Sequence, residues 1–254
     1  MKLERVLDKV EYSIINGSTD IEITDICYDS RKIKEGCLFI CLVGSSFDGH
    51  DYIDSAIEKG AKAVLVEKDV TREDTTIIKV NNTRRVLSQI SINYFNNPSS
   101  KLTTIAITGT KGKTTTSFMI KNILEEDNKK VGVIGTMGVF FKDKHYSTVN
   151  TTPESSDIQK YLNEMVNDGV EYLVMEVSSQ ALKVGRVDGM LFDYGIFTNL
   201  SEDHIGENEH KDMEEYIYCK SLLFKMCKNA IFNVYDTYYN NMIKNSTCNI
   251  YTFG

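Results

Sequence analysis

The sequence contains no tryptophan and only two prolines, Pro98 and Pro153, among its 254 residues. No apolar run approaches the ~20 residues that a membrane-spanning helix requires, so we expect no membrane partner. Acidic residues outnumber basic ones by 36 to 29, and the resulting net charge of −7 does not favour non-specific binding to nucleic acid. No long basic run offsets this balance, and we expect no nucleic-acid partner.

The six cysteines form no CxxC pair and no Cys/His spacing of the kind that binds zinc. Residues 1–12 are a charged amphipathic pattern and do not look like a signal peptide. Without an export signal the thiols are expected to stay reduced, and the predicted location is the cytoplasm.

Short strand patterns alternate with helix patterns along the chain, which predicts an α/β fold. The polar stretch NNPSSK, residues 96–101, is the best candidate for a linker. We therefore predict a small N-terminal α/β domain at 1–98 and a P-loop domain at 99–254. In the second domain we expect strands at 103–108, 130–134, 171–177, 194–198 and 230–234, and helices at 114–127, 154–168 and 212–227. This alternation predicts a mostly parallel sheet flanked by helices, with ligands at the carboxyl ends of its strands.

The best-defined motif is GTKGKTT, residues 109–115, between a predicted strand and a predicted helix. Strand, glycine-rich turn, Lys-Thr and helix make up the phosphate-binding P-loop, whose N–H groups and helix N-terminus attract an anion. Lys113 would reach the outer phosphates and the Thr114 hydroxyl would bind Mg²⁺. The general pattern is incomplete, because Ile107 stands where its first glycine belongs. A glycine turn before an ordinary helix is the alternative.

Polar residues also follow the next predicted strand, at NTTPE, residues 150–154. Thr152 can be the N-cap of the following helix, with Pro153 in the first helical position. Alternatively, Thr151 and Thr152 present hydroxyls and a helix N-terminus to an anionic ligand. The residues alone leave both interpretations open.

Ionisable groups follow two further strands. Glu176 ends an apolar strand, where an unpaired carboxylate is costly to bury. Binding of Mg²⁺ would explain it, and a salt-bridged structural glutamate is the alternative. Asp203 and His204 follow the strand at 194–198 and are candidates for a second cation or a phosphate contact, whereas His210 is expected to be structural.

Lys220 lies in the predicted helix 212–227, and the residues alone favour a solvated lysine. An ammonium group has no free lone pair and therefore cannot bind a metal ion. A role as a metal ligand does not follow from the lysine itself.

As a set, these motifs resemble those of the Mur ligases. The resemblance covers all 254 residues, from DSRKIKEG and FDGHDYI through GTKGKTT, NTTPE, MEVSS and FTNLSEDH to EEYIYCK. The GTxGKT form of the P-loop is typical of this family, which accounts for Ile107. The first domain resembles the branch that adds the third amino acid to UDP-N-acetylmuramoyl-dipeptide and is not shared with folylpolyglutamate synthetases.

The resemblance implies roles for matching positions. The uridine nucleotide would be held by Ser30, Ser45, Ser46 and Phe47. ATP would be held by Gly109, Thr110, Lys111, Gly112, Lys113, Thr114 and Thr115. The muramoyl-dipeptide would be held by Asn150, Thr151, Thr152, Ser178 and Arg186. Two Mg²⁺ would be held by Thr114, Glu176, His204 and Lys220, and the catalytic group would comprise Lys113, Lys220 and His204.

Lys220 matches the lysine that this family carbamylates with CO₂, and a carbamate is an anionic oxygen ligand. The implied reaction in peptidoglycan synthesis is ATP-driven amide formation through an acyl phosphate, with the UDP-precursor and an amino acid as substrates. Family members also have a C-terminal domain that binds the amino acid. No stretch here matches that domain, so this chain alone is expected not to complete catalysis.

Several positions depart from the family pattern. Gln180 replaces a common histidine, Val184 replaces a common polar contact, and residues 205–210 differ from the usual LDYHG. Two alternatives therefore stay open. The protein could be a divergent paralogue with another substrate, or a catalytically inactive module that binds nucleotide or UDP-precursor. A P-loop GTPase is disfavoured, because the sequence has no NKxD motif.

Overall fold

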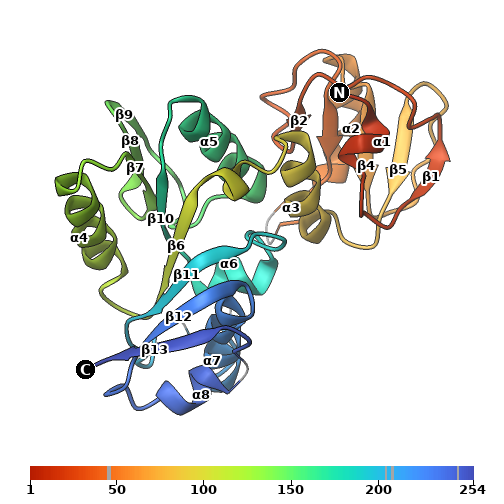
Figure 1. Cartoon of the computed structure of the whole chain (residues 1–254). Coiled ribbons are helices and arrows are strands. Elements are labelled where there is room, and N and C mark those ends of the chain that lie inside the picture. Colours follow the sequence, from red (N-terminus) through yellow and green to blue (C-terminus); the bar gives the residue numbers. More distant parts are fainter. Residues whose placement is uncertain (45–46, 204, 207–208, 245) are drawn as a thin grey trace. The chain divides into compact units, whose positions relative to one another are not determined.

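The computed structural model divides the chain into two compact units, Met1–Asn97 and Pro98–Gly254. It describes residues 1–44, 47–203, 205–206, 209–244 and 246–254. Each unit contains its own sheet with helices around it, which confirms the predicted α/β fold (Figure 1). None of the helices in these residues combines the length and apolar character that crossing a bilayer demands.

The first unit is built on a five-stranded sheet with the order β1-β5-β4-β3-β2. Its elements are α1 (Leu3–Val6), β1 (Ser13–Asn16), β2 (Ile26–Cys27), β3 (Leu38–Ile40), the 3₁₀ helix η1 (Gly49–Tyr52), α2 (Ile53–Glu58), β4 (Ala63–Val66), β5 (Thr76–Lys79) and α3 (Thr83–Tyr94). Strands β2 to β5 run parallel, and β1 pairs antiparallel with β5 at the edge.

Strand β4 shows why this sheet is apolar on both faces. Ala63 and Leu65 point into a core formed with α1 and α3, whereas Val64 and Val66 point into a second core formed with α2. All four side chains are fully buried. Because successive strand residues face opposite sides, helices on both faces require a continuous apolar run.

The second unit is built on an eight-stranded sheet with the order β13-β12-β11-β6-β10-β7-β8-β9. Its strands are β6 (Thr103–Thr108), β7 (Val131–Gly135), β8 (Gly138–Phe141), β9 (Lys144–Tyr146), β10 (Tyr172–Glu176), β11 (Phe192–Phe197), β12 (Cys227–Asn233) and β13 (Asn249–Phe253). Its helices are η2 (Pro98–Lys101), α4 (Lys113–Glu126), α5 (Ser155–Asn167), α6 (Ser179–Val184), α7 (Met213–Ser221), η3 (Leu222–Lys225) and α8 (Tyr239–Ile243). The strands from β13 to β7 are parallel, and β8 and β9 add an antiparallel edge.

Helices α4 and α5 cover opposite faces of this sheet. Val131 and Val133 of β7 pack in a core with Phe118 of α4. Gly132, between them, points to the other face, where a Cβ atom would lie 2.6 Å from the sulfur of Met165 in α5. The helices thus bury both faces of the sheet. The carboxyl ends of its strands are left for polar groups.

The predicted elements differ from the observed ones mainly where elements are short. The helix predicted at 212–227 ends at Ser221 as α-helix and continues as the 3₁₀ helix η3, so that β12 begins at Cys227 and not at 230. Strands β1, β8 and β9 and helices α6 and α8 were not predicted. Each has three to six residues, too few for a period of 2 or 3.6 to stand out.

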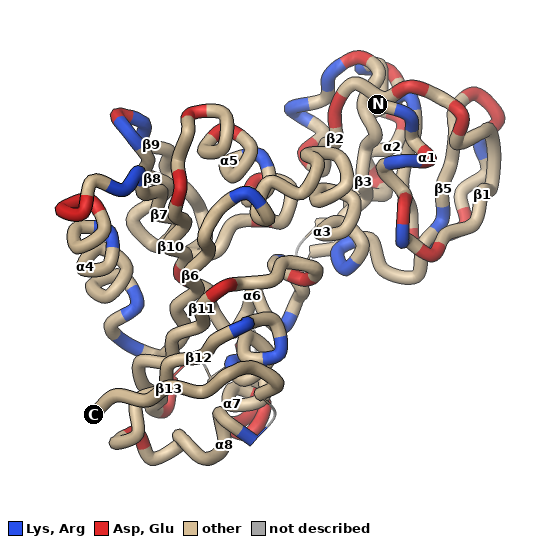
Figure 2. Tube along the Cα trace, in the orientation of Figure 1, with Lys and Arg blue, Asp and Glu red and all other residues tan. Residues whose placement is uncertain are grey.

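Charges of both signs are interspersed along the two units, as Figure 2 shows. One charged contact joins three strands of the second unit. The Asp193 carboxylate on β11 accepts hydrogen bonds from Thr104 N (2.8 Å) and Thr104 Oγ1 (3.1 Å) on β6, and pairs with Lys228 on β12 (2.7 Å). Burial opposes the charge, but Lys228 and Thr104 outweigh it and lower the pKa of Asp193.

We expect Asp193→Asn to lower the free energy of unfolding at pH 7 by about 1–3 kcal/mol, because hydrogen bonds to a charged group are lost. The folded-state pKa lies below the unfolded-state value, so this stabilisation is complete above the unfolded-state pKa. It is lost as the pH falls through the folded-state pKa, and the two proteins should converge in acid. Urea unfolding followed by tyrosine fluorescence measures the difference. Asp143→Asn, in an exposed turn, is the control, and an equal loss in both variants would contradict the prediction.

Candidate active site

The loop between β6 and α4 carries the GTKGKTT motif, and its two glycines are required for different reasons. Gly109 has φ +154°, and a Cβ atom there would lie 2.0 Å from Thr198 Oγ1. Gly112 is the N-cap of α4 in the left-handed conformation, with φ +83°, and a Cβ atom there would meet nothing within 4 Å. The first glycine makes room for Thr198, which directly follows β11, and the second permits the turn into the helix.

Two lysines meet at this loop. Lys113 Nζ donates to the carbonyl oxygens of Gly109 (2.8 Å) and Thr110 (3.1 Å). Lys220 Nζ, from α7, donates to the same Gly109 oxygen at 2.9 Å. Lys220 is only 1% exposed, so the interpretation as a solvated lysine is wrong.

Burial disfavours the charged form of both lysines. It lowers the pKa of Lys220 to about 7, with the nearby Lys113 as the second cause and Asp203 acting in the opposite direction. The pKa of Lys113 is also lowered by burial, and Glu176 and Asp203 oppose this. Lys220 Nζ lies 4.5 Å from the ring centroid of Tyr216, a contact that favours its cationic form.

The fully buried Glu176 ends β10 next to the P-loop. Its Oε2 accepts hydrogen bonds from Thr114 Oγ1 (3.0 Å) and Thr136 Oγ1 (3.2 Å), and its Oε1 accepts one from Thr136 N (3.1 Å). The carboxylate is thus satisfied by hydroxyls and a backbone N–H. This arrangement differs from the salt bridge that the alternative interpretation required.

These oxygens suit Mg²⁺, which prefers octahedral oxygen ligands at 2.0–2.1 Å, so that neighbouring ligands lie roughly 3 Å apart. The Thr114 and Glu176 oxygens are 3.0 Å apart. Within the described ranges, no three His, Cys, Asp or Glu side chains gather as a complete metal site. A cation bound by Thr114 and Glu176 would need further ligands, and phosphate oxygens and water are ligands that Mg²⁺ commonly takes.

The loop before α5 does not cap that helix as predicted. Glu154 is the N-cap, without a side-chain cap, and α5 begins at Ser155. Thr152 is fully buried, and its hydroxyl donates to Glu176 O (3.0 Å) and accepts from Ser178 N (3.0 Å). The N-cap prediction for Thr152 is wrong because this hydroxyl closes the end of β10 instead.

The other residues expected to contact the dipeptide lie around this strand end. Arg186 pairs with Glu154 (2.9 Å) and donates to Thr152 O (2.9 Å). The Ser178 hydroxyl caps α6 through Ala181 N (3.2 Å). Thr151 Oγ1 lies 3.0 Å from Thr136 Oγ1, and Asn150 is exposed. The structure thus places these residues near the carboxyl end of β10, where Glu176 lies.

Two histidines, His204 and His210, follow β11 in the sequence. His204 lies outside the described residues. His210 is 1% exposed, with Nε2 at 2.9 Å from Ser179 Oγ and Nδ1 at 3.6 Å from the Glu215 carboxylate. Burial is the main cause of its lowered pKa. These contacts fit the structural role expected for His210.

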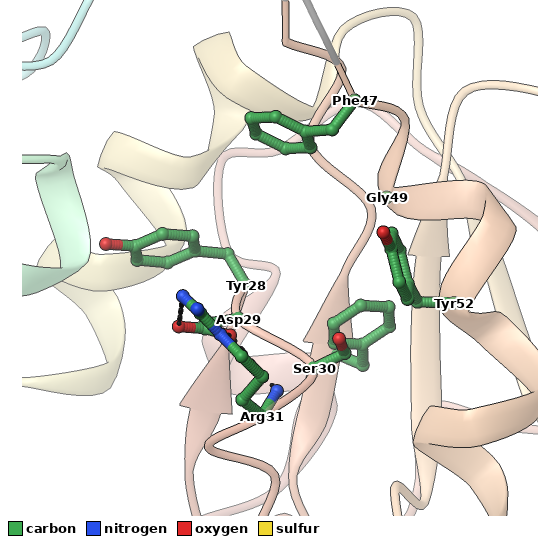
Figure 3. A pocket seen from close by; sticks show the side chains of 8 residues that line it. Tyr28, Asp29, Ser30, Arg31, Phe47, Gly49 and Tyr52 are labelled. Carbon is green, nitrogen blue, oxygen red and sulfur yellow. Dashed lines mark hydrogen bonds and ion pairs between the residues drawn. The ribbon is translucent and has the colours of Figure 1, made fainter.

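The first unit contains a pocket of about 340 Å³, shown in Figure 3. It is lined by Tyr28, Asp29, Ser30, Arg31, Phe39, Phe47, Gly49 and Tyr52. The Arg31 guanidinium binds the Asp29 carboxylate through two contacts of 2.9 Å. Ser30 and Phe47 are thus brought to one pocket, whereas Ser45 and Ser46 lie outside the described residues.

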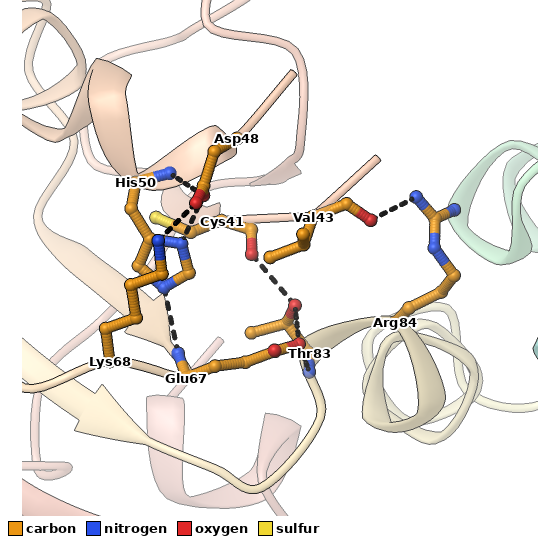
Figure 4. A network of polar contacts seen from close by, with 8 residues as sticks. All are labelled: Cys41, Val43, Asp48, His50, Glu67, Lys68, Thr83 and Arg84. Carbon is orange, nitrogen blue, oxygen red and sulfur yellow. Dashed lines mark hydrogen bonds and ion pairs between the residues drawn. The ribbon is translucent and has the colours of Figure 1, made fainter. Parts of the chain in front are cut away.

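A polar network involves Val43 and Asp48, on either side of residues 44–47 (Figure 4). Asp48 accepts from His50 N (2.9 Å) and His50 Nδ1 (2.6 Å), and it pairs with Lys68. His50 Nε2 accepts from Glu67 N (3.0 Å), so the ring proton is on Nδ1. Arg84 donates to Val43 O at 3.2 Å. Val43 and Asp48 are therefore each held by side-chain contacts.

Two family models match the sequence. The Mur ligase middle domain matches residues 107–254, which is more than half of the chain. The chain belongs to the Mur ligase family. A second model, described as the Mur ligase family catalytic domain, matches residues 22–95.

Relatives of this Mur ligase chain include two proteins named UDP-N-acetylmuramoyl-L-alanyl-D-glutamate--2,6-diaminopimelate ligase. The one from Clostridium tetani is 46% identical over 258 residues, covering 100% of this chain and 53% of the relative. The one from Caldanaerobacter subterraneus is 44% identical over 256 residues, covering 100% and 52%. A solved structure of a protein with the same name has a TM-score of 0.83 at 25% identity, covering 99% of this chain and 52% of that one. The chain thus spans about half the length of the relatives that it matches.

Sequence reasoning missed several residues of this candidate site. Thr136 follows β7 directly, so the rule of inspecting strand ends would have found it. Tyr216 precedes Lys220 by one helical turn, and its hydroxyl lies 3.3 Å from Thr110 Oγ1. Tyr28 and Tyr52 of the pocket carried no signal in a single sequence, because aromatic residues are commonly part of the core.

We expect Gly135→Ala to disturb the position of Glu176, because the new Cβ atom would lie 2.1 Å from Glu176 Oε1. The side chain or the backbone must shift to avoid this clash, and such a shift should lower the free energy of unfolding by about 1–3 kcal/mol, as at other overpacked sites. Urea unfolding measures the loss. Gly206→Ala is the matched control, because a Cβ atom there meets nothing within 4 Å. Equal stability of the two variants would show that Glu176 has room to move.

Proposed function

We propose that this chain supplies the ATP-binding and UDP-precursor-binding parts of an ATP-dependent, amide-forming ligase. The observation that carries the proposal is the contact between the P-loop hydroxyl of Thr114 and the buried carboxylate of Glu176. A buried carboxylate next to a phosphate-binding loop suits a cation that binds phosphate oxygens. Residues 109–115 would hold ATP, and Thr114 and Glu176 would hold Mg²⁺, with His204 as a further candidate ligand.

The names of the relatives support UDP-N-acetylmuramoyl-L-alanyl-D-glutamate and 2,6-diaminopimelate as the substrates. The pocket of the first unit would take the uridine nucleotide, because aromatic walls suit a planar base. Ser30 and Phe47 line it, and we assign Ser45 and Ser46 to the same nucleotide. Since ATP and such precursors are cytoplasmic compounds, the proposed location is the cytoplasm.

We assign the dipeptide to the region at the carboxyl end of β10 that contains Asn150, Thr151 and Ser178. Thr152 is fully buried, so it would act by holding the end of β10 and not by direct contact. Arg186 is paired with Glu154, and a direct contact with a substrate carboxylate would require exchange of this partner. Both residues therefore shape the loop that receives the dipeptide.

The proposed reaction has two steps. A carboxylate oxygen of the dipeptide attacks the γ-phosphorus of ATP, the bond between this phosphorus and the oxygen of ADP breaks, and the products are an acyl phosphate and ADP. The amine of the amino acid then attacks the acyl carbon, loses a proton, and displaces inorganic phosphate through a tetrahedral intermediate. Lys113 places a positive charge where anionic oxygens approach each other, which lowers the cost of their meeting.

We further propose that Lys220 acts as a carbamate. Its pKa of about 7 leaves a substantial share of neutral amine near neutral pH, and only the neutral amine can attack the carbon of CO₂. A carbamate nitrogen keeps one N–H, so the hydrogen bond to Gly109 O can persist after the modification. The new carboxylate would lie beside Lys113 and supply oxygen ligands for a cation.

Calorimetry tests binding by this chain. We expect it to bind ADP with Mg²⁺ and, independently, UDP-N-acetylmuramoyl-L-alanyl-D-glutamate. Failure to bind either compound would contradict the proposal. Ligation is then measured on the protein as its gene encodes it, with ATP and a panel of amino acids. Binding of both compounds without ligation there would favour a catalytically inactive binding module.

We expect Lys113→Ala to reduce the affinity for ADP and Mg²⁺ by about tenfold or more, because a charge-assisted contact to phosphate is lost. The fold should be unaffected, since Lys113 Nζ donates its hydrogen bonds within the P-loop, to Gly109 O and Thr110 O. Calorimetry and urea unfolding measure the two quantities. Lys121→Ala, on the same helix, is the control. Unchanged ADP affinity in Lys113→Ala would refute the assigned role.

We expect ¹³C-bicarbonate to give a carbamate signal in the ¹³C NMR spectrum that disappears in Lys220→Arg. The signal should weaken as the pH falls below about 7, because protonation of the amine competes with carbamate formation. Lys228→Arg is the control, as Lys228 is exposed. A signal of equal intensity in Lys220→Arg would assign the carbamate to another amine.

A further inference from the structure

Thr136 contacts the Glu176 carboxylate through both of its donor groups. Its backbone N–H binds Oε1 at 3.1 Å, and its hydroxyl binds Oε2 at 3.2 Å. Since each carboxylate oxygen is held, rotation about the last side-chain bond of Glu176 would break both contacts. The preceding residue is Gly135, where a Cβ atom would lie 2.1 Å from Oε1. The end of β7 is thus shaped around this carboxylate.

The hydroxyl groups at this point form a chain with a defined direction. A hydroxyl has one proton to donate, and an ionised carboxylate can only accept. Thr136 gives its proton to Glu176, so the 3.0 Å contact with Thr151 requires Thr151 to donate to Thr136. The order is Thr151 to Thr136 to Glu176. Thr136 therefore connects the metal-binding candidate with the loop assigned to the dipeptide.

A bound cation would affect the hydrogen bonds from Thr114 and Thr136 to Glu176 differently. Both donate to Oε2 of Glu176, at 3.0 Å and 3.2 Å. A cation bound between Thr114 and Glu176 would take the lone pair of Oε2 that accepts the Thr114 proton, so this hydrogen bond must be given up. The Thr136 contacts come from a different strand end, β7, and can remain.

We propose that Thr136 is a positioning residue that holds Glu176 in the orientation that binds Mg²⁺ together with a nucleotide. This inference rests on the proposed function, because it assumes that Glu176 binds the cation. Thr136 would not touch the cation or the nucleotide. It would act through the carboxylate, by preventing the rotations that the buried side chain could otherwise make when Thr114 is withdrawn.

The test measures ADP affinity by calorimetry in EDTA and in MgCl₂, and takes the ratio of the two affinities. We expect Thr136→Val, which removes the hydroxyl and keeps the backbone N–H, to reduce this ratio about tenfold, the effect of losing a hydrogen bond to a charged group. The affinity in EDTA should stay within about twofold of the original protein, since Glu176 is not needed without the cation. Thr136→Ser, which keeps the hydroxyl, should retain the ratio.

Thr103→Val is the matched control, because Thr103 begins β6, at the opposite end of the same sheet. Thr136→Ala removes the same hydroxyl with less bulk, and it gives a second measurement if the valine variant does not fold. An unchanged ratio in the valine and alanine variants would overturn the inference. So would an equal loss of ADP affinity in EDTA, which would indicate damage to the loop. If Mg²⁺ does not increase ADP affinity in the unmodified chain, the proposed metal site itself fails.

Discussion

The carbonyl oxygen of Gly109 accepts hydrogen bonds from Lys113 and Lys220, and much of the site depends on this shared acceptor. It holds two amines close together in a largely buried environment, where two positive charges are unfavourable. The arrangement becomes favourable when one amine is neutral or when an anion enters. Phosphate groups at the P-loop and a carbamate on Lys220 would both supply that negative charge. Electrostatics therefore prepares this loop for an anionic ligand.

Glu176 places a buried negative charge at the same end of the sheet, near Lys113. Burying a charge is costly unless hydrogen bonds replace its hydration. Here Thr114 and Thr136 supply three of them, and Lys113 contributes electrostatically from the P-loop. Hydroxyl partners are more easily exchanged for a cation than an arginine would be, because no opposite charge has to leave. This makes Glu176 better suited to a metal site than to a structural salt bridge.

Much of this fold could be predicted from the sequence, because long apolar strands and helices repeat at clear periods. The strand at 103–108 matches β6 over its full length, and the helix expected at 114–127 is α4, Lys113–Glu126. Burial was harder to predict. Lys220 has the sequence environment of an ordinary helix lysine, yet packing against Gly109 and Tyr216 buries it. Thr152 has the sequence of an N-cap but uses its hydroxyl on β10, a choice that only tertiary contacts decide.

The order of the strands explains why residues far apart in sequence meet at this site. In the sheet, β6 lies between β11 and β10, and β7 lies next to β10. The P-loop follows β6, Asp203 lies beyond β11, Glu176 ends β10, and Thr136 follows β7. Because these strands are parallel, all four groups lie at the same end of the sheet, where the strands have their carboxyl ends. Hydrophobic periodicity predicts each strand but not its neighbours. The sequence can therefore place Glu176 and Thr136 at strand ends, but it cannot show that Thr136 contacts the Glu176 carboxylate.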